Sequence, residues 1–156
     1  MAHIDGGLRK LFRANIPDVF WTSIESGQTG GGISDSNFLC EGVEGWVEYK
    51  QTDGWAVTLK PEQVGWILRR VRCGGRALIA VRRWTDGGPR SPACDELWLV
   101  PGRLAAEAKT GGLRHPVVTG EALRWRGGPS RWDWETVRAA VLGPWAAPAG
   151  GPLWWP

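Results

Sequence analysis

Cysteine and histidine are scarce in this sequence of 156 residues, and their scarcity excludes several kinds of site. Cys40, Cys73 and Cys94 are odd in number and form no Cys-x-x-Cys pair, which excludes a zinc knuckle and argues against a disulfide scaffold. Only His3 and His115 are present. A catalytic triad or a histidine-rich metal centre therefore has almost no residues to draw on.

Long apolar runs are also lacking. The longest, around residues 77–81, has the length of a strand and falls far short of the roughly 18 residues that cross a bilayer. Residues 1–10 include Asp5 and lack the continuous apolar stretch of a signal peptide. Hydrophobic residues still make up 42% of the chain, enough for a packed core. We expect a cytoplasmic protein without membrane contact.

The charged residues are unevenly distributed, although the net charge is only +3. Residues 1–68 contain 5 Lys and Arg against 9 Asp and Glu, whereas residues 69–156 contain 14 against 7. Most of the basic residues are arginine, whose forked guanidinium matches phosphate oxygens. This asymmetry is typical of an acidic metal site beside a polyanion-binding surface. A GC-rich genome, which also raises the arginine content, is the alternative explanation.

Hydrophobic periodicity and the positions of Gly and Pro predict the order of helices and strands. Helices are expected at 8–14, from Pro61 to about Cys73, at 101–110 and at 131–142, the last with Ser130 as its cap and Asp133 at the capping-box position. Strands are expected at 19–25, 35–39, 45–51, 56–59, 76–83 and 96–100. The order predicts one α/β or α+β domain over residues 1–142 with a mixed central sheet, a core over about residues 8–100, and a Pro/Gly/Trp-rich tail over residues 143–156.

One group of residues in this order has a clear chemical use. Glu48 and Lys50 lie two apart in a predicted strand and so face the same side of the sheet. If the strand after Asp35 pairs antiparallel with it, Asp35 reaches the same edge. Two carboxylates and the main-chain carbonyl of Tyr49 can then hold Mg²⁺, while Lys50 orients an attacking water. The plainer alternatives are a solvated strand face for Glu48 and Lys50 and a turn position for Asp35.

These residues stand in segments that resemble the PD-(D/E)XK nuclease superfamily. The segments are GISDSNF at 32–38, GWVEYK at 45–50 and LKPEQVGW at 59–66, followed by the strand CGGRALIAV at 73–81. The resemblance covers about residues 19–83 and is closest to small phage-encoded endonucleases of the Holliday junction resolvase type. One departure is Ser34, which stands where the family has proline.

The resemblance implies a restriction-endonuclease-like core and a set of site residues. Asp35, Glu48 and Lys50 would be catalytic, and Glu25 would be a further metal ligand, unless it is an ordinary surface carboxylate. Gln63 would support the site, unless it only satisfies backbone donors in the first turn of its helix. The implied activity is hydrolysis of DNA, branched substrates included, with Mg²⁺ or with Mn²⁺ in its place. A homodimer and a phage or virion protein partner are further expectations, and the location would be the host cytoplasm or the virion.

The arginines of the second half form three groups that we predict to bind DNA. The groups are Arg69, Arg70 and Arg72; Arg82 and Arg83; and Arg124, Arg126 and Arg131. Trp125, Trp132 and Trp134 are interleaved with the third group, and such a surface can grip phosphates and stack on unpaired bases. Equally, Trp132 and Trp134 can be core or dimer-contact residues.

Two other classes of function remain open at this point. The first is a DNA-binding or virion-associated protein that kept the nuclease fold without the activity. The second is a small structural domain whose acidic residues are merely solvated.

Overall fold

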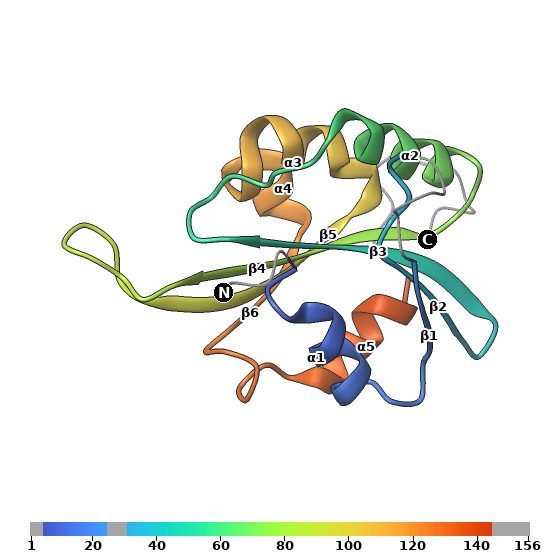
Figure 1. The fold of residues 1–156 in the computed structure, drawn as a ribbon, viewed down its shortest axis with the longest axis horizontal. Coiled ribbons are helices and arrows are strands. Elements are labelled where there is room, and N and C mark those ends of the chain that lie inside the picture. The colour runs from blue at the N-terminus through green and yellow to red at the C-terminus, as the bar shows by residue number, and fades with distance from the viewer. Residues whose placement is uncertain (1–4, 25–30, 145–156) are drawn as a thin grey trace.

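The computed structural model describes residues 5–24 and 31–144, and every structural statement below refers to them. Six strands form one sheet in the order β1-β2-β3-β4-β5-β6 (Figure 1). All neighbours are antiparallel except β3 and β4, which are parallel and are joined through helix α2. The strands are β1 Phe20–Ser23, β2 Ser36–Cys40, β3 Val43–Thr52, β4 Ala77–Thr85, β5 Cys94–Pro101 and β6 Leu123–Arg126. The predicted α/β class with a mixed, helix-flanked sheet is confirmed.

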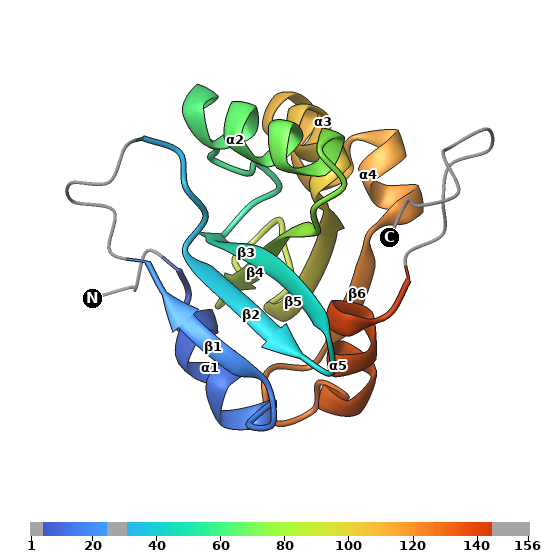
Figure 2. The ribbon, with the colours of Figure 1, turned by 90° about the vertical axis from the view of Figure 1, so that its right-hand side faces the viewer.

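Helices cover both faces of the sheet (Figures 1 and 2). One face carries α1 (Leu8–Asn15) and α5 (Trp134–Leu142), and the other carries α2 (Pro61–Arg72), α3 (Ala105–Gly111) and α4 (Pro116–Glu121). The short 3-10 turns Gly102–Leu104 and Gly112–Arg114 flank α3. None of the helices in the described ranges is long and apolar enough to cross a membrane.

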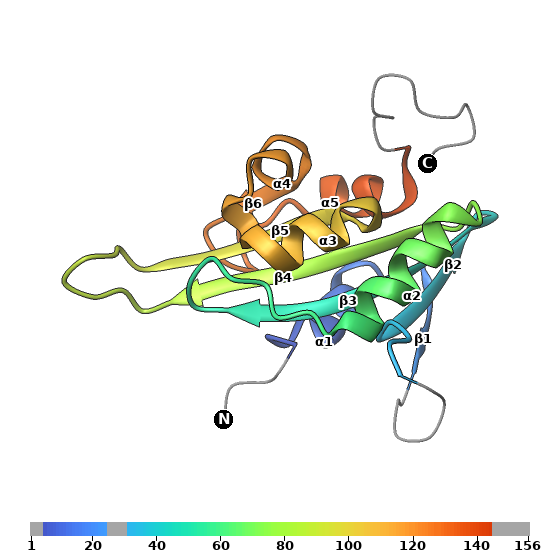
Figure 3. The same cartoon turned by 90° about the horizontal axis from the view of Figure 1, so that it is seen from above.

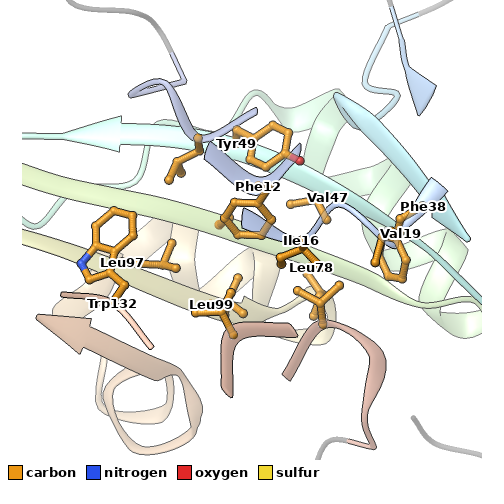
Figure 4. Close-up of a cluster of buried hydrophobic side chains, with 14 of the residues drawn as sticks. Phe12, Ile16, Val19, Phe38, Val47, Tyr49, Leu78, Leu97, Leu99 and Trp132 are labelled. Atoms are coloured by element: carbon orange, nitrogen blue, oxygen red, sulfur yellow. The ribbon is translucent and has the colours of Figure 1, made fainter. Parts of the chain in front are cut away.

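Strand β3 divides its side chains between two hydrophobic cores, as the alternation of a strand requires. Val47 and Tyr49 enter the core beneath α1 and α5 (Figure 4). Trp46 packs against the core beneath α2 and α3, and Glu48 and Lys50 point to that same face. The first core also buries Trp132, Val137 and Val141, so the packed domain extends well past residue 100.

Two predicted elements differ from the structure. Residues 56–59 form no strand and pair with no strand of the sheet; Val57 and Leu59 alternate with exposed residues because they are buried in the second core. Helix α5 begins at Trp134 instead of residue 131, and Asp133 is its cap, with Asp133 Oδ1 accepting from the Thr136 N–H at 3.2 Å. Strand β6 and helix α4 were not predicted.

Two hairpins shape the sheet. Glu41 and Gly42, both with positive φ (51° and 81°), form the two-residue turn between β2 and β3. Turns of this kind match the strand twist, and this one sets Ser36 opposite Val47. The hairpin of β4 and β5 projects beyond the rest of the molecule (Figure 3).

Candidate active site

The register of the β2–β3 hairpin brings Asp35 to the edge of β3. The Asp35 main-chain carbonyl accepts a hydrogen bond from the Ile24 N–H at 2.9 Å, and its side-chain Oδ2 accepts from the Tyr49 N–H at 2.9 Å. In a sheet, the N–H and C=O of one residue point to the same neighbour. The Tyr49 carbonyl therefore faces the same edge as the Asp35 carboxylate, just beyond the end of β2.

Glu48, Lys50 and Gln63 meet on the face of the sheet that α2 covers. Glu48 Oε1 lies 2.9 Å from Lys50 Nζ and accepts from Gln63 Nε2 at 2.5 Å. Gln63 Oε1 accepts from Lys50 Nζ at 3.2 Å and from the Lys60 N–H at 3.0 Å. Gln63 therefore closes the first turn of α2 and also contacts both the acid and the amine.

Burial leaves the Glu48 carboxylate only partly satisfied. Glu48 is 1% exposed, and its Oε2 has no hydrogen-bond partner among the described residues. Burial and then the nearby charge of Asp35 raise the pKa of Glu48 from 4.5 to about 7, and the contact with Lys50 offsets only part of this. A buried carboxylate with an open oxygen beside a second carboxylate has lower energy when a cation joins it.

The donor atoms at this edge fit a hard divalent cation. Glu48 Oε2, the Asp35 carboxylate and the Tyr49 carbonyl are all oxygens, the ligands that Mg²⁺ and Mn²⁺ prefer. Within residues 5–24 and 31–144, no three Asp, Glu, His or Cys side chains gather closely enough to hold a metal by themselves. Glu25, the predicted additional ligand, lies outside the described residues.

The predicted DNA-binding arginines fall into two kinds. Arg69, Arg72, Arg126 and Arg131 are exposed. Arg70 is half-buried, with its guanidinium 5.0 Å from the centre of the Trp46 ring, and Arg124 pairs with Glu96. For these six, DNA contact stays a prediction.

The side chains of Arg82 and Arg83 bind other residues of this chain. Arg82 donates two hydrogen bonds to Asp95, at 2.9 and 2.7 Å. Arg83 is 6% exposed, stacks 3.8 Å from the centre of the Trp55 ring and donates to the Gly54 carbonyl at 2.9 Å. The pleat of β4 turns the Arg83 side chain into the domain, so Arg83 does not lie on the surface where we predicted DNA contact. For Arg82, which is half-buried, DNA contact stays a prediction.

The tryptophans of the third arginine group are mostly structural. Trp132 is 4% exposed within the first core, so of the two alternatives left open for it the core position is confirmed. Trp134 Nε1 donates to the Pro129 carbonyl at 2.9 Å, and Trp125 Nε1 donates to Thr136 Oγ1 at 2.8 Å. The tryptophans of the tail, Trp145, Trp154 and Trp155, lie outside the described residues.

Sequence reasoning missed one residue at the site. Arg9, on the polar side of α1, has a guanidinium nitrogen 3.6 Å from Asp35 Oδ1. The helical periodicity of α1 places Arg9 beside the buried face of Leu8 and Phe12, but nothing in the spacing indicates that Arg9 meets a carboxylate 26 residues further along the chain.

Comparison with known proteins adds no assignment. No family model matches this sequence, and no curated protein matches it.

Proposed function

We propose that this chain is a Mg²⁺-dependent DNA endonuclease of the PD-(D/E)XK kind, similar to Holliday junction resolvases. The observation that carries the proposal is that Glu48, Lys50 and Gln63 contact one another, while Asp35 binds the Tyr49 N–H beside them and its charge acts on Glu48. Glu48 Oε2 is buried there without a partner in the described part of the chain. A solvated strand face would not account for it, because Glu48 is 1% exposed.

Each residue has a distinct role in this proposal. Asp35, Glu48 and the Tyr49 carbonyl would hold the ion, with Glu25 as a further ligand. A bound Mg²⁺ would supply a Lewis acid that polarises the scissile phosphate and lowers the pKa of a bound water. Lys50 would orient the attacking water and stabilise charge that develops on the phosphate. Gln63 is a positioning residue, because it fixes Glu48 and Lys50 at their distance from each other.

Exposed arginines support a DNA substrate. Arg69 and Arg72 lie on α2, the helix that carries Gln63, and Arg126 and Arg131 lie at the end of β6 and beyond it. Guanidinium groups there can bind backbone phosphates without reading the sequence. We expect a homodimer if the enzyme makes paired cuts, with a phage or virion protein as another expected partner.

The main alternative is a catalytically silent DNA-binding protein with the same fold. Both are tested by incubating the protein with supercoiled plasmid and with a four-way junction, with EDTA, Mg²⁺ or Mn²⁺. The proposal predicts nicks or cuts only with metal, and none from Glu48→Gln. Glu135→Gln, which alters an exposed residue on α5, is the control and should cut like the wild type. DNA binding without cuts under both metals would support the silent alternative.

A further inference from the structure

A basic cavity borders the candidate site on the face opposite Lys50. It has a volume of about 560 Å³ and is lined by Asp5, Gly7, Arg9, Lys10, Arg13 and Ala14, all in or just before α1. The acid among them is occupied, since Asp5 Oδ1 accepts from the Gly7 N–H at 2.9 Å. Among the described lining residues three are cations and one is a carboxylate; most of the lining surface is apolar, and the net positive charge of these side chains favours an anionic group.

Arg9 belongs both to this cavity and to the candidate metal site. Its guanidinium nitrogen lies 3.6 Å from Asp35 Oδ1, longer than the 2.7–2.9 Å typical of a charge-assisted hydrogen bond. Arg9 Nε is buried and has no hydrogen-bond partner among the described residues. Arg13, one turn further along, is held by Ser23 Oγ at 2.6 Å. Of the two arginines of the cavity, Arg9 is therefore the more loosely held, and it is the one that lies beside Asp35.

We propose that Arg9 couples metal binding to DNA binding, with a backbone phosphate of DNA seated in the cavity of α1. This inference rests on the proposed function, because it takes Asp35 as a metal ligand. Without DNA, the Arg9 charge beside Asp35 repels an incoming divalent cation. A phosphate in the cavity neutralises the Arg9 charge and draws the guanidinium away from Asp35. The divalent ion therefore binds more tightly once DNA is present. Linkage requires that the ion then tightens DNA binding by the same factor.

The coupling is measurable without any cleavage readout. The probe ion is Ca²⁺, which takes oxygen ligands, and its affinity is measured by calorimetry on the full chain at low salt, with and without a short DNA duplex. We expect the duplex to tighten Ca²⁺ binding to the wild type. In Arg9→Gln, Ca²⁺ binding without DNA should tighten about two- to fivefold, the range of a partly exposed ion pair. The ratio of Ca²⁺ affinities with and without the duplex should then fall close to one.

Three controls locate the effect at Arg9. Arg90→Gln removes an exposed charge in the hairpin between β4 and β5, outside the cavity, so Ca²⁺ affinity and its gain from DNA should both stay as in the wild type. Arg9→Lys keeps the charge and should keep most of the coupling. Inorganic phosphate at the concentration of duplex phosphates should give little gain, because only a polymer seats its phosphate at a high local concentration.

The outcomes separate this inference from the proposed function. Unchanged Ca²⁺ affinities in Arg9→Gln, with binding abolished by Glu48→Gln, would overturn the coupling and leave the metal site standing. An equal gain from free phosphate would overturn the assignment of the cavity to DNA. Absence of Ca²⁺ binding to the wild type, with and without DNA, would overturn both proposals.

Discussion

Two buried glutamates on the same face of the sheet show how a structural acid differs from a candidate site. Glu48 on β3 is 1% exposed and Glu96 on β5 is 5% exposed. Both oxygens of Glu96 have partners: Arg124 binds Oε1, while Trp98 Nε1, at 3.1 Å, and Arg83, at 3.5 Å, bind Oε2. Glu48 has partners on Oε1 alone among the described residues, and it faces a second carboxylate in Asp35.

The two environments shift the pKa values of the two glutamates in opposite directions. Burial favours the neutral form of both, but at Glu96 the hydrogen bonds from Arg124 and Trp98 outweigh burial and lower the pKa. At Glu48 burial and Asp35 prevail and raise the pKa to about 7. Both oxygens of Glu96 therefore have a cationic partner, whereas Glu48 Oε2 has none among the described residues. Perturbed acids of the second kind are typical of functional sites.

The largest expected difference between the two glutamates is in catalysis. Glu48→Gln should lower the rate of Mg²⁺-dependent plasmid nicking at least about a hundredfold, because it removes a negatively charged ligand from the site. Glu96→Gln should keep nicking close to the wild type at saturating DNA and at a temperature where it is folded. Equal losses in both variants would show that Glu48 has no special role.

The two substitutions should change the free energy of unfolding in opposite directions. At pH 8 without metal, Glu48→Gln should raise the free energy of unfolding by about 1–3 kcal/mol, since it removes a buried charge that costs energy in the folded state. Glu96→Gln should lower it by about 1–3 kcal/mol, because Arg83 and Arg124 lose a charged acceptor. Urea denaturation of the three proteins measures both changes.

The gain from Glu48→Gln should also depend on pH. The folded pKa of Glu48, about 7, exceeds the ordinary value of 4.5, so between these values the native state binds more protons than the unfolded chain. The charge of Glu48 therefore lowers stability progressively as pH rises from about 4.5 to 7. The advantage of Glu48→Gln should be absent near pH 4 and complete near pH 8. A gain of the same size at both pH values would refute the raised pKa.

The smallest expected effect concerns the exposed arginines. The double variant Arg126→Gln, Arg131→Gln should weaken DNA binding and reduce the slope of log affinity against log salt by about two, because each arginine would neutralise one backbone phosphate. Arg138→Gln is the control, because Arg138 already pairs with Asp18 at 2.6 Å. Fluorescence anisotropy over a salt series measures the slopes, and an unchanged slope in the double variant would remove these residues from the DNA surface.

Local pattern was enough to predict most of the candidate site. The spacing of Glu48 and Lys50 dictates a shared face, and a tight hairpin brings Asp35 to their edge, so these contacts follow from strand geometry. Gln63 was inferred only from resemblance, since its contact depends on how α2 packs over β3. The approach of Arg9 depends in the same way on the packing of α1.

The errors in the fold have the same origin. The pleat of β4 puts Arg82 and Arg83 on opposite faces, but which face is covered at this end depends on Glu96 of β5 and on Trp55 in the segment after β3, and their positions follow from packing. Residues 56–59 alternate like a strand because burial imposes that pattern on any extended segment. The four residues of β6 and the six of α4 are too short for periodicity to reveal.

The most direct test of the account is to locate a bound ion by anomalous diffraction from crystals of the protein soaked in Mn²⁺. The account predicts a peak at the edge of β3, roughly 2.0–2.2 Å from Glu48 Oε2 and from an oxygen of Asp35, absent from Glu48→Gln. A peak only elsewhere, or bound Mn²⁺ that contacts neither Glu48 nor Asp35, would contradict it.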